Sequence, residues 1–171
     1  KPPQFKRKKF LFVCDEALSG SVALQLKEEG HLVKMYIQQP LDQDVYDGFV
    51  EKIKHWKQHL DWADVVVFDT IGFGSKADEL RAAGKLVVGG SEYTDRLEAD
   101  REFGQTEMSD AGMLTPPSWN FNDYDDAVRF LKSHPGRYVF KPSGDVSYDS
   151  RTYVFIGKEE DGKDLIEMLE Q

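Results

Sequence analysis

The chain has one cysteine and no apolar run long enough to cross a membrane. Cys14 is alone among 171 residues and forms no disulfide within the chain, which is typical of proteins from a reducing cytoplasm. A membrane helix needs about 18 consecutive apolar residues, and no stretch approaches that length. No signal peptide is recognisable, although the chain starts at Lys1 rather than Met. These absences favour a cytoplasmic protein that does not insert into membranes.

Positive charge is also scarce. The chain has 22 Lys and Arg against 31 Asp and Glu, which gives a formal net charge of −9. Nonspecific nucleic-acid binding requires clustered cations, so we expect no nucleic-acid partner. The one basic cluster is at the start, at Lys1, Lys6, Arg7, Lys8 and Lys9, and we expect a solvated arm there. Anions must therefore bind at focused sites.

Several common catalytic motifs are missing as well. The sequence contains no Walker A motif, no H-E-x-x-H, no C-x-x-C and no G-x-S-x-G. Cys14 ends an apolar run and is interpreted as a small packed residue. His55 and His59 would share one helix face, but no third metal ligand lies nearby, so we expect solvated histidines.

What the sequence does contain is an alternation of strand and helix patterns. Four apolar runs predict buried strands at Lys9–Cys14, His31–Ile37, Val65–Phe68 and Leu86–Val88. Helices are predicted from Ser21 to a terminating Gly30, from Val45 to Leu60, and within Gly72–Ala83. This order predicts a Rossmann-like parallel sheet in an α/β domain, with ligands at the carboxyl ends of its strands.

The pattern changes after Gly90. Ser91, Asp100 and Asn122 or Asp123 are each expected to cap a helix, and Phe103 and Met108 are expected to face inward from the second. A hairpin formed by 138–140 and 152–156 follows, and then a last helix capped by Asp161. We predict two domains, 1–90 and 91–171, and we expect the chain to end partway through the second, because a two-stranded hairpin with a few helices forms a thin core.

Two strand-end loops are candidate substrate sites. Ser19 and Gly20 stand at a predicted helix N-terminus, where backbone N–H groups can hold an anion, although ordinary helix capping explains them too. Gly72 and Gly74 fit a loose G-x-G-x-x-A dinucleotide pattern, and Glu92 lies at a suitable distance to bind a ribose. A tight turn between strand and helix is the alternative interpretation of the two glycines.

Two cations are candidates for phosphate binding. Lys141 follows the apolar Tyr138–Phe140 run and precedes the Ser143-Gly144 turn, so the hairpin would present it at its tip. Arg101 lies just inside a predicted helix start, where a cation has the unfavourable sign for the helix dipole. An anionic ligand is one reason to keep it there, and an ion pair with Glu98 or Asp95 is another.

Over roughly residues 81–144 the chain resembles the ATP-grasp ligases, most closely the phosphoribosylamine–glycine ligases (glycinamide ribonucleotide synthetases). The sequences of those enzymes contain the motifs G-P-S, L-E-x-S-K-x-F, G-I-P-T, E-A and V-V-K-x-x-G in that order. The matching stretches here are Arg81–Ser91, Leu97–Phe103, Gly112–Pro116, Tyr124–Ala127 and Val139–Gly144. The resemblance implies a pre-ATP-grasp domain over 1–90, followed by the small α+β nucleotide-binding subdomain of an ATP-grasp fold.

The resemblance also implies a chemistry. Lys141, with Ser143 and Gly144 beside it, would contact ATP phosphates, and Arg101 replaces a family lysine that reaches the same nucleotide. The reaction would form an acyl phosphate from a carboxylate and ATP, which an amine then attacks, with Mg²⁺ stabilising the transferred phosphoryl group. The magnesium ligands of the family lie in a large subdomain that this sequence does not contain, so the chain as given is expected not to complete catalysis.

Two stretches depart from the family pattern. Asp145–Arg151 stands where the family has a glycine-rich flap, and Arg151 would supply the missing cation. Asp69–Gly74 replaces the family's G-P-E substrate motif, so a different substrate is expected. Two other hypotheses are a nicotinamide-dinucleotide-binding protein that uses Gly72 and Gly74, and a noncatalytic binding module with the same fold.

Overall fold

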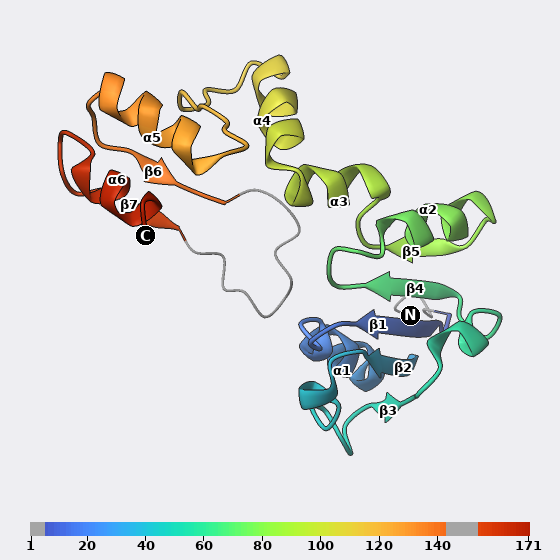
Figure 1. Cartoon of the computed structure of the whole chain (residues 1–171). Helices are drawn as coiled ribbons and strands as arrows, with labels where there is room; N and C mark the ends of the chain where they lie inside the picture. The colour runs from blue at the N-terminus through green and yellow to red at the C-terminus, as the bar shows by residue number, and fades with distance from the viewer. Residues whose placement is uncertain (1–5, 143–153) are drawn as a thin grey trace. The chain divides into compact units, whose positions relative to one another are not determined.

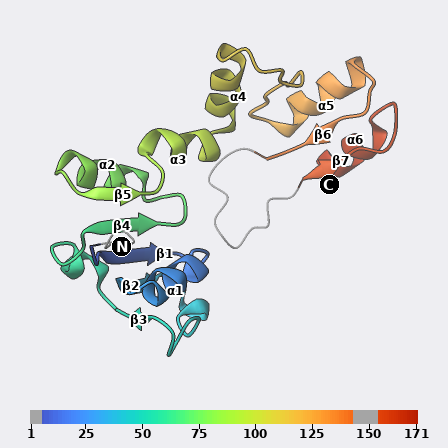
Figure 2. The ribbon, with the colours of Figure 1, turned by 180° about the vertical axis from the view of Figure 1, so that it is seen from behind.

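The computed structural model describes residues 6–142 and 154–171, and the chain forms two compact units, residues 1–98 and 99–171 (Figures 1 and 2). Each unit is described by itself below. The assignment of the two parts to a pre-ATP-grasp domain and a small nucleotide-binding subdomain, divided at Gly90, stays a prediction.

Unit 1 is built on a parallel sheet of five strands in the order β3-β2-β1-β4-β5 (Figure 1). Its strands are β1 (Lys9–Cys14), β2 (Leu32–Ile37), β3 (Glu51–Lys52), β4 (Val65–Phe68) and β5 (Leu86–Val88). All four ladders are parallel. The predicted α/β class and all four predicted strands are confirmed, and β3 is the strand that the sequence patterns missed.

Two helices cover opposite faces of this sheet. Helix α1 (Gly20–Glu28) follows β1, and helix α2 (Gly74–Ala82) follows β4. Because successive strand residues face opposite sides, β1 contributes to both cores. The core on the α2 side contains Leu11, Val13, Trp56, Ala63, Val66, Phe68, Ala77 and Leu80. The core on the α1 side contains Phe12, Cys14, Ala17, Ala23, Val33, Met35, Ile37 and Val50.

The predicted helix from Val45 to Leu60 is wrong. Its place is taken by turns, by strand β3 and by the short 3-10 helix η2 (Trp56–His59), after an earlier 3-10 helix η1 (Pro40–Asp42). Tyr46 and Gly48 both have positive φ angles, +62° and +78°, which an α-helix does not accommodate. Lys52 stabilises the turns, since its Nζ donates to the carbonyls of Gln43 and Val45.

Without that helix, His55 and His59 do not share the face of an α-helix. His55 precedes η2, and Nδ1 of His59 lies 3.3 Å from Nζ of Lys34. No group of three or more His, Cys, Asp or Glu side chains able to hold a metal ion occurs within residues 6–142 and 154–171.

Helix α3 (Glu92–Ala99) and helix α4 (Arg101–Asp110) lead from unit 1 into unit 2, and both begin as the sequence predicts. The Ser91 hydroxyl accepts the N–H of Thr94, and Asp100 accepts the N–H of Phe103 over 3.0 Å. The expectation that Met108 faces inward is wrong, because this side chain is 39% exposed on the polar surface of α4.

Unit 2 packs helix α5 (Tyr124–Ser133) and helix α6 (Lys163–Leu169) against a short antiparallel hairpin, β6 (Val139–Phe140) with β7 (Phe155–Ile156). The N-cap of α5 is Asp123, as predicted, and it accepts from the N–H of Asp125. The hairpin and the last helix are confirmed as well, but the predicted Asp161 cap is wrong, because the N-cap of α6 is Gly162 in the left-handed conformation. The buried side chains are Ala127, Val128, Leu131 and Leu165.

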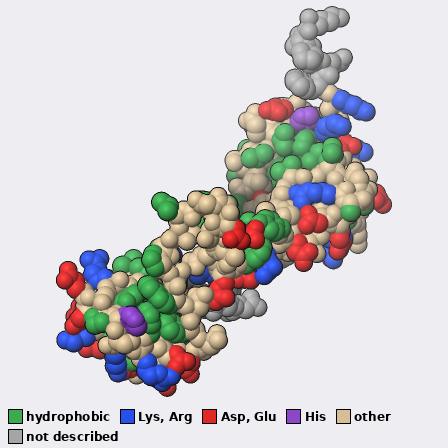
Figure 3. All heavy atoms as spheres, turned by 90° about the horizontal axis from the view of Figure 1, so that it is seen from above, with side chains coloured by type: hydrophobic (Ala, Val, Ile, Leu, Met, Phe, Trp, Pro, Cys, Tyr) green, Lys and Arg blue, Asp and Glu red, His purple; other side chains and the backbone are tan. Residues whose placement is uncertain are grey.

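The surface of the described residues is mixed in character. Hydrophobic side chains are visible between charged ones on the face shown in Figure 3. In the part of the chain that the structure covers, no helix has the length and apolarity to span a membrane.

Candidate functional site

The carboxyl ends of β1 and β4 form the edge where ligands are expected in this fold. The two strands are neighbours, with Val13 opposite Phe68, yet α1 leads from β1 to one side of the sheet and α2 leads from β4 to the other. Ligands of open α/β sheets bind in the crevice where the connections diverge in this way. We call this place the ligand edge, and it consists of Cys14, Asp15, Ser19, Gly20 and Asp69.

At the ligand edge, Ser19 is bonded to a carboxylate of the chain itself. Both its backbone N–H and its hydroxyl donate to Oδ2 of Asp69, over 2.9 and 2.8 Å. Ser19 is the residue that precedes helix α1, so its N–H is one of the donors that would otherwise face an incoming anion. Asp69 therefore occupies the position that the sequence analysis assigned to a ligand.

The other oxygen of Asp69 accepts no hydrogen bond from the residues that the structure describes. Its Oδ1 is buried and makes no hydrogen bond within the described residues, although the residue as a whole is only half-buried. Asp15, the first residue after β1, is 9% exposed, and no hydrogen bond to its carboxylate is formed in the described part of the chain. The Asp69 carboxylate also acts electrostatically on the neighbouring Cys14 thiol.

The adjacent Cys14 thiol is buried, and its environment disfavours the thiolate. Burial raises the pKa of Cys14 far above its usual range, and the Asp69 carboxylate adds to the effect, while the nearby Ser19 hydroxyl, 3.5 Å from the sulfur, opposes it. A thiol must ionise to react, so Cys14 stays inert at neutral pH. Its interpretation as a packed core residue agrees with its complete burial.

Gly20 has a packing role. A Cβ on Gly20 would stand 1.9 Å from Cε2 of Tyr46, so the ring of Tyr46 lies directly against the first turn of α1. Tyr46 itself adopts the left-handed conformation, with φ +62°, that places its side chain there. The glycine thus accommodates a ring of the same chain, and its role toward a ligand stays a prediction.

The second pair of predicted glycines also meets a carboxylate. Gly72 and Gly74 donate their backbone N–H groups to the same oxygen of Asp95, over 3.0 and 2.7 Å. A Cβ on Gly74 would stand 2.2 Å from the carbonyl oxygen of Ser91, so this turn packs closely against the segment before α3. The tight-turn interpretation of Gly72 and Gly74 explains their geometry, and their binding of a dinucleotide or substrate stays a prediction.

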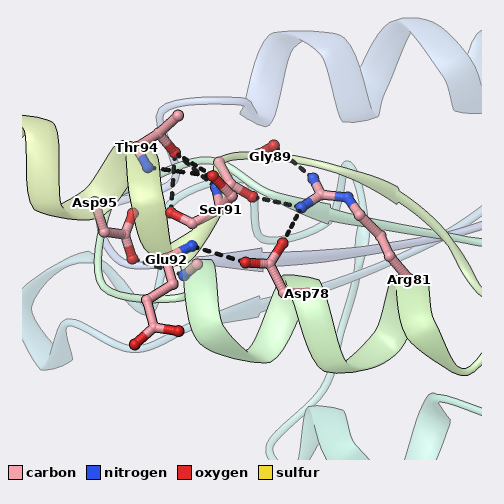
Figure 4. A network of polar contacts seen from close by, with 9 residues as sticks. Asp78, Arg81, Gly89, Ser91, Glu92, Thr94 and Asp95 are labelled. Atoms are coloured by element: carbon pink, nitrogen blue, oxygen red, sulfur yellow. Dashed lines mark hydrogen bonds and ion pairs between the residues drawn. The ribbon is translucent and has the colours of Figure 1, made fainter. Parts of the chain in front are cut away.

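A polar network joins this turn to the end of β5 (Figure 4). Arg81 donates to Asp78 and to the carbonyls of Gly89 and Gly90, and the N–H of Glu92 donates to Asp78 over 2.9 Å. Figure 4 shows the Glu92 carboxylate pointing away from the other labelled side chains. Glu92 thus contributes its backbone to the network, and ribose binding by its carboxylate stays a prediction.

In unit 2 the two predicted phosphate-binding cations lie at the ends of secondary-structure elements. Arg101 is the first residue of α4, and its Nε is buried without a hydrogen-bond partner in the described part of the chain. Lys141 follows β6 directly and is exposed. Ser143, Gly144 and Arg151, predicted to assist them, lie outside the described residues.

Three acidic residues at these loops were not predicted as site residues, namely Asp15, Asp69 and Asp95, and the last two bond to the loop backbone. A signal for the first two exists in the sequence. Asp15 and Asp69 come directly after buried strands, and residues in that position of a parallel sheet meet at the ligand edge. No sequence pattern marks Asp95, because only the tertiary fold brings it to its partners Gly72 and Gly74.

The comparisons with known proteins find likeness at the level of structure only. No protein-family model and no curated protein matches the sequence. The N5-carboxyaminoimidazole ribonucleotide synthetase from Thermotoga maritima matches 92% of this chain with a TM-score of 0.60 and 20% identity. The Staphylococcus aureus N5-carboxyaminoimidazole synthetase complexed with ADP matches 98% with a TM-score of 0.63 and 15% identity. A further synthetase of this kind, also an ADP complex, matches 95% with a TM-score of 0.65 and 16% identity.

The chain spans less than half of the length of these neighbours, since the matches cover 43%, 46% and 44% of them. At such low sequence identity the likeness bears on the fold. The parallel sheet of unit 1 and the α+β arrangement of unit 2 have the fold of the corresponding portion of these ATP-grasp proteins.

Proposed function

We propose that this chain is the nucleotide-binding portion of an ATP-dependent carboxylate–amine ligase of the ATP-grasp kind. Its partners are small molecules, ATP with a carboxylate and an amine. Arg101 and Lys141 contact the ATP phosphates, with Ser143, Gly144 and Arg151 completing the phosphate site. The ADP complexes among the structural neighbours support this proposal, since their fold is the one that this chain adopts.

The observation that carries the proposal is the state of Arg101. A guanidinium with a buried, unpartnered Nε is costly, because a buried donor without an acceptor loses its hydration and gains nothing in return. The cost is increased by its place at the start of α4, where the helix dipole repels a cation. A polyphosphate beside Arg101 would remove both costs.

Lys141 supplies the second positive charge of the proposed site. It extends from the end of β6, and a strand end holds the lysine backbone in a fixed place while its side chain is free to reach a ligand. Within the described residues this exposed lysine forms no ion pair, which leaves its ammonium available.

Magnesium accompanies ATP in this chemistry and neutralises charge on the transferred phosphoryl group. We expect its ligands in the large subdomain of the family, and within residues 6–142 and 154–171 no group of three or more His, Cys, Asp or Glu side chains could hold a metal ion. The contribution of the chain itself is to bind the nucleotide phosphates through cations.

The test is calorimetric titration of the chain with ATP. Arg101→Ala and Lys141→Ala should each weaken ATP binding by about tenfold or more, since a hydrogen bond to a charged group contributes about 1.5–3 kcal/mol. Matched controls are Arg137→Ala and Lys158→Ala, which remove exposed cations of the same unit. Unchanged affinity in both site variants, or an equal loss in the controls, would reject the assignment.

The substrates are a finer part of the proposal. The sequence resemblance favours phosphoribosylamine and glycine, whereas the structural neighbours act in the synthesis of N5-carboxyaminoimidazole ribonucleotide. Because the chain by itself is not expected to complete catalysis, calorimetric titration with each ligase's product, glycinamide ribonucleotide or N5-carboxyaminoimidazole ribonucleotide, distinguishes the two assignments by binding. ATP binding without binding of either product would favour the noncatalytic binding module. A cytoplasmic location stays a prediction.

The nicotinamide alternative has a specific obstacle. A pyrophosphate at Gly72 and Gly74 would have to displace the Asp95 carboxylate from both N–H groups. Enhanced NADH fluorescence on binding, together with no ATP binding, would nevertheless establish that alternative.

A further inference from the structure

Two aspartates of this chain stand directly before a glycine, at Asp47-Gly48 and at Asp161-Gly162. Such pairs can rearrange spontaneously to isoaspartate, because glycine has no side chain to hinder the reaction. We infer that Asp47 is a site of this modification and that Asp161 is protected from it by its hydrogen bonds. The inference does not depend on the proposed function.

The rearrangement needs no cofactor and no reactant other than water. The backbone nitrogen of the glycine attacks Cγ of the aspartate, a C–N bond forms, and one water molecule leaves, which gives a five-membered succinimide. Water then adds to one of the two ring carbonyls and opens the ring. Opening at the main-chain carbonyl gives isoaspartate, which has the mass of aspartate and one more methylene in the backbone.

The turn at Asp47 leaves both reacting groups accessible. The N–H of Phe49 donates to the carbonyl of Tyr46 over 3.1 Å, and Gly48 has a φ of +78°, the positive angle typical of the third residue of a type II turn. Gly48 donates its own N–H to no residue of the described ranges. The Asp47 side chain is 63% exposed, so nucleophile and carboxyl group both face solvent.

One contact restrains the Asp47 carboxylate, and it is weak. Nζ of Lys52 lies 3.4 Å from Oδ1 of Asp47. The same ammonium donates over 2.8 and 2.6 Å to the carbonyls of Gln43 and Val45, so its shorter hydrogen bonds are made elsewhere. An ion pair with one exposed partner contributes little, which leaves the carboxyl group able to turn toward the nitrogen of Gly48.

At Asp161 the fold engages both reacting groups. The N–H of Gly162 donates to the carbonyl of Glu159 over 3.3 Å. Oδ1 of Asp161 accepts the N–H of Lys163 over 3.2 Å, and its Oδ2 lies 3.2 Å from Nζ of the same lysine. The N–H and then the ammonium of Lys163 hold the pKa of Asp161 below its usual range. Since the protonated carboxyl group is the form that loses water, fewer molecules are able to react.

The test is ageing of the folded chain in mildly acidic buffer at body temperature. Trypsin then separates the two sites into the fragments 35–52 and 159–163. Isoaspartate in each fragment is counted by methyl transfer from S-adenosylmethionine with an isoaspartyl methyltransferase and located by fragmentation in a mass spectrometer. We expect position 47 to exceed position 161 by roughly tenfold or more, because hydrogen bonds must break at Asp161 before the ring forms. Equal amounts, or more at Asp161, would overturn the inference.

Two controls show whether the structure is the cause. Ageing in guanidinium chloride removes the fold, and the two sites should then react at similar rates. A ratio unchanged by unfolding would show that local sequence alone decides, against the inference. Asp47→Glu should abolish the modification in fragment 35–52, because glutamate would need a six-membered ring. Isoaspartate persisting there in Asp47→Glu would place the reaction at Asp42 or Asp44 and would likewise overturn it.

Discussion

Gly74 donates its backbone N–H to the carboxylate of Asp95 over 2.7 Å, at the first residue of helix α2. This bond connects the start of α2 to helix α3. The Asp95 carboxylate therefore lies at a helix N-terminus, where an anion could otherwise bind. The same relationship exists between Ser19 and Asp69 at the start of α1. Both helices that leave the sheet at the ligand edge thus begin against an internal carboxylate.

Asp95→Ala should destabilise unit 1 measurably. The substitution leaves the N–H groups of Gly72 and Gly74 without their acceptor and removes a negative charge from a helix start. We expect the free energy of unfolding in urea to fall by about 2–3 kcal/mol. Glu98→Ala, an exposed position one turn further along α3, is the control. Equal effects of the two substitutions would show that the hydrogen bonds to Asp95 do not contribute to the free energy of unfolding.

Gly20→Ala should destabilise the chain through a clash with the ring of Tyr46. The new methyl group would overlap the Tyr46 ring, and overpacking of this kind costs about 1–3 kcal/mol. Tyr46→Gly removes the ring and suits the positive φ angle at that position. In a double-mutant cycle measured by urea unfolding, Gly20→Ala should cost much less in the Tyr46→Gly background. Additive effects would contradict the contact.

Cys14 should resist alkylation. Burial raises the pKa of its thiol, so the thiolate population of the folded chain stays negligible at neutral and mildly alkaline pH. A group whose pKa is raised on folding contributes stability that is present below the unfolded pKa, about 8.5 for a cysteine, and lost as the pH rises above it. Iodoacetamide labelling should thus be slow in buffer and fast in urea, and stability should fall above about pH 8.5. Fast labelling of the folded chain would show that the thiol is accessible.

Asp164 should make the start of α6 sensitive to acid. Its carboxylate accepts the backbone N–H groups of Lys158 and Leu165, over 2.6 and 2.9 Å, and these bonds hold its pKa below the usual range. A depressed pKa contributes stability that is present above the unfolded value, about 3.9, and lost as the pH falls through the lower folded value. Asp164→Asn should weaken amide-exchange protection at Lys158 at neutral pH. It should also remove the acid dependence of that protection, whereas Glu167→Gln should change neither.

Sequence patterns predicted the strands well because buried strands leave continuous apolar runs. The prediction failed at 45–60, where an apolar stripe at helical spacing is also compatible with turns and a short edge strand. Gly48, inside the predicted helix, has a positive φ angle that an α-helix does not accommodate. Glu51 pairs with Lys34 of the neighbouring strand, so tertiary contacts prevailed over local propensity in this stretch.

The candidate site was less predictable than the fold because its hydrogen-bonded partners lie far apart along the chain. Ser19 was recognised as a residue at a helix start, but its partner Asp69 lies 50 residues away. Asp95 likewise lies 21 residues from Gly74. A single sequence shows which backbone N–H groups could bind an anion. It does not show that carboxylates of the same chain, Asp69 and Asp95, accept from those groups.

Strand β3 has a consequence for assembly. It is two residues long, it forms the outer edge of the sheet, and Glu51 pairs there with Lys34 across 3.3 Å. Exposed sheet edges invite strands of other molecules, and proteins discourage this with short, charged edge strands. An incoming strand would find few free backbone groups at β3, and it would meet the exposed, charged side chain of Glu51 beside them. This border of the sheet is thereby protected against growth into aggregates.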